Sequence, residues 1–287
     1  MTTTVANPRT SESTRQGPLR VLIADESAGA RLNLTIALRS FDPSIEIVEV
    51  ENGSDAAEKI VALKPDVTFV NVKLPGMSGA EAVAIARLQN VKPVTILMSD
   101  TVLNRWVALS TELDAYEFLK KPFDPEHVVA MMRAVTRMKQ KLRLLLVEDS
   151  QVARALIRKV LTNARFDLEV DETDSGRHAL KLMQLTKYDL ALIDLNLAGI
   201  DGFETACQAK DISPQTTLLL MSGTRNEKIE GASKHFGVAG FLQKPFYAHH
   251  VEDVLHDIFG LRRPYLLNVI GRVHSRATRK KSSAGVR

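Results

Sequence analysis

Two stretches of the sequence decide the fold: LLLVEDS at residues 144–150 and YDLALIDLNLAGIDG at residues 188–202. Each contains a short run that is apolar throughout and ends in carboxylates, Glu148 and Asp149 in the first stretch and Asp194 in the second. Strands of this composition are typical of a parallel sheet that helices cover on both faces. The carboxyl ends of parallel strands meet at one edge of the sheet, where ligand sites form. We therefore expect the three acids to lie together.

The same pattern occurs twice in the chain, at a constant offset of 123 residues, which is the interval between Glu26 and Asp149. VLIADES (21–27) corresponds to LLLVEDS, and VTFVNVKLPGMSG (67–79) corresponds to the stretch around Asp194. A constant offset across a whole unit indicates a duplicated domain. The matched pairs are Asp25 with Glu148, Glu26 with Asp149, Asn71 with Asp194, Gly79 with Gly202, Ser99 with Ser222, and Lys121 with Lys244.

Apolar runs alternate with helical patterns in both units. In the second unit, Ala153, Leu156, Ile157 and Val160 follow the acidic pair at helical spacing. Five such strand–helix steps predict an α/β fold, with two doubly wound, flavodoxin-like, five-stranded parallel sheets in tandem. The divisions that we expect are a disordered tail at 1–18, domains at 19–142 and 143–260, and a basic tail at 261–287. The joint between the domains is short, so we expect it to restrict the angle between them.

The composition argues against several classes of protein. Eight Lys/Arg residues and no acid lie between Arg262 and the C-terminus, whereas the whole chain carries +4, so the remainder carries a formal charge of −4 and does not indicate a nucleic-acid surface. The single cysteine, Cys207, excludes an intrachain disulfide and a thiolate metal site. No apolar run approaches the roughly 20 residues that a membrane-spanning helix needs. Since no signal peptide is recognisable either, we expect a soluble cytoplasmic protein.

The polar residues of the second unit suit phosphoryl transfer. Three convergent carboxylates repel one another unless a cation joins them, and carboxylate oxygens together with water suit Mg²⁺. Lys244 adds a compact positive charge, Ser222 adds a hydroxyl, and Gly223 leaves space beside that hydroxyl. A carboxylate in such surroundings can be an aspartyl nucleophile toward a phosphoryl group, because phosphoryl transfer depends on positioning and charge neutralisation.

This set of residues resembles the receiver domain of two-component response regulators over about residues 19–260. The matching segments are LLLVEDS, YDLALIDLNLAGIDG, LLLMSG (218–223) and GFLQKPF (240–246). The resemblance implies that Asp194 is the phospho-acceptor and that Ser222 and Lys244 hold the phosphoryl oxygens. It also implies that Phe241 is the aromatic residue that changes rotamer when the serine is drawn toward the phosphoryl group.

The resemblance further implies a Mg²⁺ site in the second unit. Its ligands would be Asp149, Asp194 and the main-chain carbonyl of Asn196, while Glu148 would act through water. One departure from the family pattern is Ala198, which stands where the family usually has proline. We expect this departure to leave the chemistry of the site unchanged.

The first unit departs from the family pattern at the acceptor itself. VTFVNVKLPGMSG keeps the frame of the corresponding stretch but places Asn71 where the second unit has Asp194. An amide cannot form an acyl phosphate by simple attack, and Asp100, in place of Gly223, should repel phosphate. The other counterparts remain: Asp25, Glu26, Ser99, Lys121 and Phe118. We expect a degenerate pseudo-receiver that is fixed in one state and used for contacts; the alternative is a retained scaffold.

These features predict a non-enzymatic signalling protein. A sensor histidine kinase would phosphorylate Asp194, and the output would be a protein–protein contact. The alternatives are a phosphorelay intermediate, which would pass the group to a histidine phosphotransfer protein, or a phosphate sink. DNA binding through the basic tail is disfavoured, because a basic arm alone binds weakly and with a steep salt dependence. A phosphatase is also disfavoured, because Asn196 stands where such enzymes typically carry a second acid.

The sequence also predicts a homodimer in which the first unit supplies much of the contact. The single tryptophan, Trp106, falls in a helix that is usually exposed in the family, and exposed tryptophan is enriched at interfaces. The next helix carries an apolar stripe that could form a seam between two helices or face the core. The stripe consists of Val128, Met131, Val135, Met138 and Leu142.

Overall fold

The computed structural model describes residues 17–101, 104–199, 201–224 and 237–264. The chain divides into two compact units, one that ends at Val129 and one that begins at Ala130. The division falls within helix α5 (Pro125–Lys139), and strand β6 (Leu142–Val147) begins after two further residues. The connection between the two sheets is therefore as short as the sequence predicts. Most of each predicted tail lies outside the described residues.

The first unit contains a five-stranded parallel sheet with the strand order β2-β1-β3-β4-β5. Its strands are β1 (Arg20–Ala24), β2 (Glu46–Val50), β3 (Val67–Asn71), β4 (Val94–Ser99) and β5 (Glu117–Lys120). The helices that connect them are α1 (Ala28–Phe41), α2 (Gly53–Leu63), α3 (Gly79–Leu88) and α4 (Asn104–Glu112). The strand order reverses beside β1 and β3, and ligands of open α/β sheets bind at such a switch point.

The second unit repeats this arrangement, because its strand order β10-β9-β8-β6-β7 is that of the first sheet read from the opposite edge. Its further strands are β7 (Leu168–Thr173), β8 (Leu190–Asp194), β9 (Thr217–Ser222) and β10 (Val238–Gln243). Its helices among the described residues are α6 (Gln151–Thr162), α7 (Gly176–Leu185), α8 (Gly202–Ile212) and α10 (Ala248–Ile258). The duplication that the constant offset indicates is thus confirmed, as is the predicted fold class.

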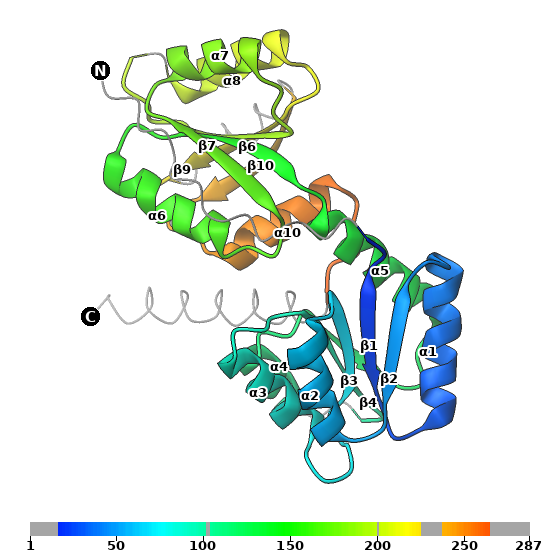
Figure 1. Cartoon of the computed structure of the whole chain (residues 1–287). Coiled ribbons are helices and arrows are strands. Elements are labelled where there is room, and N and C mark those ends of the chain that lie inside the picture. The colour runs from blue at the N-terminus through cyan, green and yellow to red at the C-terminus, as the bar shows by residue number, and fades with distance from the viewer. Residues whose placement is uncertain (1–16, 102–103, 200, 225–236, 265–287) are drawn as a thin grey trace, which may run out of the picture. The chain divides into compact units, whose positions relative to one another are not determined.

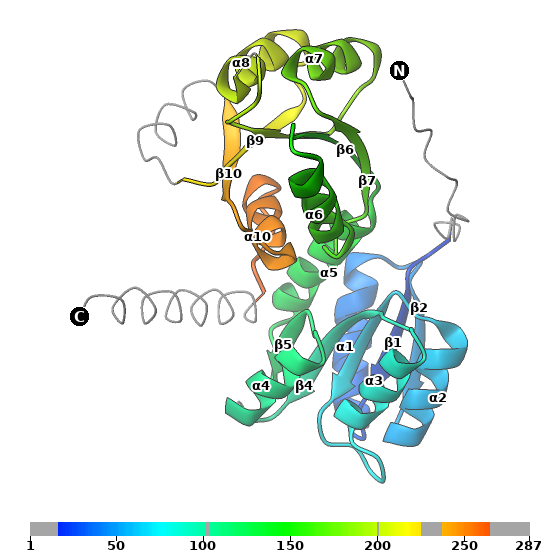
Figure 2. The same cartoon turned by 90° about the vertical axis from the view of Figure 1, so that its left-hand side faces the viewer.

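Helices cover both faces of each sheet, which explains why the strands are apolar throughout. In the second unit, α7 and α8 lie on one face and α6 and α10 on the other (Figure 1; Figure 2). In the first unit, α1 lies on the opposite face from α2 and α3 (Figure 1). Every residue of β3 and of β8 is buried as a result. Asn71 and Asp194, which end these two strands, are therefore held at the edge of a buried core.

The serine that closes each acidic motif begins the helix that follows it. The side chain of Ser150 accepts a hydrogen bond from the amide of Ala153 at 3.4 Å, and Ser27 accepts one from Ala30 at 3.3 Å. Such N-caps satisfy an amide that the first helical turn leaves without a partner. The acidic residues consequently occupy a short turn between the strand end and the helix start.

Helix α6 is present where the sequence predicts it, but its buried face differs from the prediction. Ile157 and Leu161 are buried, whereas Leu156 is 62% exposed. Successive residues of an α-helix lie about 100° apart around its axis. Leu156 therefore lies beside the buried stripe rather than on it, and its helical spacing alone could not distinguish these two positions.

Candidate functional site

The three acids of the second unit meet at the carboxyl end of the sheet, as the sequence predicts. Glu148 and Asp149 lie in the turn after β6, and Asp194 ends β8. One carboxylate oxygen from each residue lies within 4.8 Å of the others. Glu148 and Asp194 are buried and Asp149 is exposed, so the cluster is open to solvent on one side. Such an arrangement of hard oxygen ligands is suited to Mg²⁺.

Lys244 places its ammonium group among these acids. Its Nζ lies 2.5 Å from Oε2 of Glu148 and 3.0 Å from Oδ1 of Asp194. The contact with Asp194 is electrostatic, because that oxygen is buried and accepts no hydrogen bond among the described residues. Oδ1 of Asp194 is thus paired with one cation and accepts no hydrogen bond among the described residues, so it can take a further electrophilic partner such as a metal ion.

Ser222 ends β9 beside this lysine. The amide of Lys244 donates to the carbonyl of Ser222 at 2.7 Å, which ties the two strand ends together. The hydroxyl of Ser222 is almost fully buried and accepts a hydrogen bond from the amide of Thr224 at 3.2 Å. The counterpart in the first unit is the same, because the amide of Thr101 donates to Ser99 at 3.3 Å.

The structure also places two other predicted site residues, Phe241 and Asn196. Phe241 lies in β10, is partly buried and packs against the core of the second unit. Asn196 is exposed in the turn after β8. Phe241 thus lies on the strand that leads to Lys244, and Asn196 lies two residues after Asp194; the roles of both residues stay predictions.

Ala198 contributes a contact that the sequence did not predict. Its amide donates a hydrogen bond to Oδ2 of Asp149 at 3.0 Å. Proline has no amide hydrogen, so the residue that the family usually has could not make this bond. In the first unit Pro75 occupies the corresponding position. The replacement of proline by Ala198 was thus visible in the sequence, but its effect on Asp149 was not.

The first unit keeps the lysine and a buried acid at the corresponding site but lacks the carboxylate that Asp194 supplies in the second unit. Asp25 is fully buried, and its Oδ2 lies 2.9 Å from Nζ of Lys121. Asn71, which ends β3, is buried like Asp194 but carries no charge. Asp100 lies 3.7 Å from Nζ of Lys121 and is 79% exposed. Among the described residues no three-acid cluster forms in this unit.

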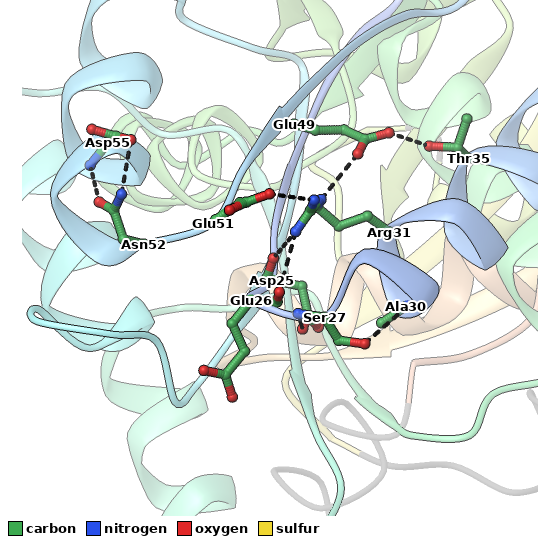
Figure 3. A network of polar contacts seen from close by, with 10 residues as sticks. All are labelled: Asp25, Glu26, Ser27, Ala30, Arg31, Thr35, Glu49, Glu51, Asn52 and Asp55. Carbon is green, nitrogen blue, oxygen red and sulfur yellow. Dashed lines mark hydrogen bonds and ion pairs between the residues drawn. The ribbon is translucent and has the colours of Figure 1, made fainter.

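Each acidic turn is also bound from the side by an arginine, which the sequence analysis missed. Figure 3 shows Arg31 of α1 between the main chain of Asp25 and Glu26 and two glutamates of the β2 edge, Glu49 and Glu51. No sequence pattern identifies a side chain that binds main-chain carbonyls. The repeat offers the one signal, because an arginine recurs 123 residues later, at Arg154.

Trp106, the predicted interface residue, is half-buried in α4 rather than exposed. The guanidinium of Arg105 lies 4.5 Å from the centre of its ring. The apolar stripe of α5 is buried within the single chain, so it is part of the interior rather than a seam that is free for a second copy. Its members on α5 are Val128, Met131, Val135 and Met138, whereas Leu142, which the sequence pattern assigned to the same helix, begins β6 and is buried there. The homodimer therefore stays a prediction.

Comparison with known proteins identifies the family of both units. The family of response regulator receiver domains matches residues 21–133 and 144–256. The chain belongs to this family. It carries two receiver domains in tandem, and the acid cluster around Asp194 lies in the second of them. Within the described residues, no helix combines the length and the apolar character that crossing a bilayer requires.

Curated relatives match one receiver domain each. The sensory transduction protein LytT of Bacillus subtilis is 34% identical over 110 residues, which are 38% of this chain and 45% of that protein. The DNA-binding response regulator MtrA of Mycobacterium tuberculosis is 33% identical over 122 residues, which are 41% of this chain and 50% of that protein. The chain thus spans about half the length of these relatives. The matches support two-component signalling as the setting of both receiver domains.

A solved structure matches most of the chain. The crystal structure of a two-component system response regulator/GGDEF domain protein superposes with a TM-score of 0.63 at 20% identity. The match covers 84% of this chain and 98% of the other. At this identity the comparison shows the fold alone, and it agrees with the two parallel sheets described above.

Proposed function

We propose that the chain is a two-component response regulator in which a histidine kinase phosphorylates Asp194 of the second receiver domain. The observation that carries this proposal is the ion pair of Lys244 with Asp194, at 3.0 Å, inside a cluster of three acids. The first receiver domain has Asn71 at the same place. A single chain therefore holds one site with a nucleophile and one site without.

Apart from the attacking carboxylate, the phosphoryl transfer requires no covalent participation of the protein. A carboxylate oxygen of Asp194 attacks the phosphorus of a phosphohistidine, an O–P bond forms, and the P–N bond breaks. The leaving imidazole keeps the electron pair of that bond and takes up a proton. Lys244 and Ser222 would hold the phosphoryl oxygens, which is the positioning and charge neutralisation on which phosphoryl transfer depends.

The acid cluster fits Mg²⁺. The buried Oδ1 of Asp194 accepts no hydrogen bond among the described residues, and the exposed Asp149 opens the cluster to water. Asp149, Asp194 and the main-chain carbonyl of Asn196 would hold the ion, and Glu148 would act through water. When bound, Mg²⁺ would neutralise charge on the acids and on the incoming phosphoryl group.

The output that we propose is a change of protein contacts in the cytoplasm, without catalysis by the chain itself. Ser222 would move toward the phosphoryl group, and Phe241, which packs against the core from β10, would change rotamer with it. A small local charge event of this kind can bias a larger surface between two states. Passage of the group to a histidine phosphotransfer protein, or its loss as in a phosphate sink, would use the same acceptor.

The first receiver domain would serve as a contact platform. Its pocket retains Asp25, Ser99 and Lys121 in place, but Asn71 cannot accept the group. A domain that no longer switches can keep one surface for permanent association, and we propose a homodimer that uses the surface around Trp106. The basic tail gives no reason to propose DNA binding, because the acidic body of the chain does not favour it.

Phosphotransfer profiling tests this function. Each histidine kinase of the source organism, once autophosphorylated, would be mixed briefly with the full chain and with the Asp194→Asn variant. We expect one kinase to lose its label to the wild type within seconds and to keep it in the presence of the variant. A kinase that labels both proteins equally would contradict the assignment of Asp194.

A further inference from the structure

The second receiver domain contains an arginine that binds the acidic turn but does not face the acids. Nη1 of Arg154 donates to the carbonyl of Glu148 at 2.5 Å and lies 3.5 Å from the carbonyl of Asp149. Arg154 lies in the first turns of α6, and Ser150 caps this helix. One guanidinium group therefore spans the main chain of the two residues whose carboxylates join Asp194.

This arginine is itself held by the neighbouring strand. Its Nε lies 3.6 Å from Oε2 of Glu172 in β7, and the second oxygen of Glu172 lies 3.1 Å from Arg158. The side chain of Arg154 is 18% exposed and that of Glu172 is 24% exposed, so the contact is largely shielded from water. A planar guanidinium with several fixed donors suits such a bridge between a carboxylate and main-chain oxygens.

The duplication repeats the same arrangement. In the first domain Nη1 of Arg31 donates to the carbonyls of Asp25 and Glu26 at 2.8 and 3.3 Å. Its Nε binds Glu49 at 3.0 Å and its Nη2 binds Glu51 at 2.5 Å (Figure 3). Arg31 and Arg154 are 123 residues apart, and so are Glu49 and Glu172, the glutamates of the neighbouring strands. An arginine at the same position of each repeat thus binds the main chain of the acidic turn in both domains.

The main chain between the strand and the helix has carbonyl groups that do not pair within the sheet. The amide of Glu148 still pairs with β7, because it donates to the carbonyl of Thr173 at 3.1 Å. The carbonyls of Glu148 and Asp149 point away from the sheet ladder toward Arg154. Groups that orient metal-binding residues from behind typically change metal affinity or activity ten- to a hundredfold when they are removed.

We propose that Arg154 is a positioning residue for the phosphorylation site: it fixes the turn that presents Glu148 and Asp149, so that both carboxylates stay in register with Asp194 for Mg²⁺. The proposal rests on the proposed function of this site. It predicts an effect on the concentration of Mg²⁺ that the site needs, with little effect on the maximal rate once the site is saturated.

The test uses the full chain and a small phosphodonor such as acetyl phosphate, so that the labelling rate does not depend on binding of a kinase. Initial labelling rates would be measured against Mg²⁺ concentration for the wild type, Arg154→Gln and Arg154→Lys. We expect Arg154→Gln to raise the half-saturating Mg²⁺ concentration about tenfold, and Arg154→Lys to recover part of that loss. A value for Arg154→Gln within twofold of the wild type would overturn the proposal.

Two matched controls separate this role from a general effect of lost charge. Arg158→Gln removes the same charge from the same helix and from the same glutamate, and Arg31→Gln removes the corresponding arginine from the domain that has no acceptor. Both should keep the wild-type Mg²⁺ requirement. A tenfold shift in either control would equally overturn the proposal.

Calorimetric Mg²⁺ titration of the same variants tests the role of Arg154 independently of the phosphorylation of Asp194. A weaker Mg²⁺ affinity in Arg154→Gln, combined with a wild type that is never labelled, would support the positioning role and contradict the phosphorylation of Asp194. If circular dichroism shows that Arg154→Gln does not fold, Glu172→Gln takes its place, because it loosens the arginine without removing it. We then expect a smaller shift in the same direction, and no shift would refute the role of Arg154.

Discussion

Nζ of Lys244 lies 3.0 Å from Oδ1 of Asp194 and 2.5 Å from Oε2 of Glu148, so one ammonium group balances two buried carboxylates. Its counterpart Lys121 balances one buried carboxylate, that of Asp25, together with the exposed Asp100. Asp194 therefore adds a buried negative charge where the first domain has the neutral Asn71. Several consequences of this difference are measurable.

Removal of Lys244 should destabilise the second domain more than removal of Lys121 destabilises the first. Lys244→Met leaves two buried acids without their cation, and we expect the free energy of unfolding in EDTA to fall by about 1–3 kcal/mol. Mg²⁺ should restore much of this loss, because it can replace the missing charge. Urea unfolding followed by circular dichroism, with and without Mg²⁺, measures both effects. Lys121→Met is the matched control, and Mg²⁺ should not rescue it.

Fast labelling of the first domain should require two residues to be changed together. Asn71→Asp restores the nucleophile beside Lys121, but Asp100 remains 3.7 Å from the same ammonium group and repels an incoming phosphoryl group. We expect Asn71→Asp/Asp100→Gly, in an Asp194→Asn background, to be labelled by acetyl phosphate at least tenfold faster than Asn71→Asp alone. Equal rates for the two variants would show that Asp100 does not obstruct the pocket.

The second domain should lose stability as the pH falls below about 6.5. His256 is completely buried in α10, and burial lowers the pKa of its imidazole. The unfolded chain takes up a proton near the usual histidine pKa of about 6.5, whereas the folded chain takes it up at a lower pH. The stabilising contribution is therefore present above pH 6.5 and is lost as the pH falls toward the pKa of the folded state.

Urea unfolding between pH 8 and pH 5 measures this dependence. The charged neighbours of His256 are Glu252, Asp253 and Arg165, and they remain in a His256→Gln variant. Its free energy of unfolding should change less with pH than that of the wild type. Parallel curves for the two proteins would assign the acid sensitivity to another group.

Association through the first domain is tested by the state of the full chain in solution. Trp106 is half-buried beneath Arg105, so it offers one ring face and not a whole side chain. We expect light scattering to show a dimer at tens of micromolar and Trp106→Ala to shift it toward a monomer. A monomeric wild type at that concentration would contradict the predicted dimer.

The sequence was sufficient to predict the features that depend on repetition and on strand ends. Asp25, Asn71 and Ser99 have counterparts at one constant interval, and parallel strands bring their carboxyl ends to one edge. The two parallel sheets, the acid cluster and the position of Lys244 beside it followed from these two facts, whereas the strand order came from the structure. The different roles that we propose for Asn71 and Asp194 rest on their residue types and stay predictions.

Other features depended on contacts that have no sequence pattern. Leu156 and Ile157 are adjacent in the chain, yet one is exposed and the other buried, because a helix turns about 100° per residue. Arg154 binds main-chain carbonyls, which every residue possesses, and Ala198 binds Asp149 through its amide. Such contacts depend on the geometry of the folded main chain and are therefore seen only in the structure.

We predict that this tandem receiver protein carries one phosphorylation site, at Asp194. The most direct test of this claim is the intact mass of the full chain after reaction with acetyl phosphate and Mg²⁺. We predict that the wild type and Asn71→Ala each gain one phosphoryl group and that Asp194→Asn gains none. A phosphoryl group on Asp194→Asn, or two groups on the wild type, would contradict the claim.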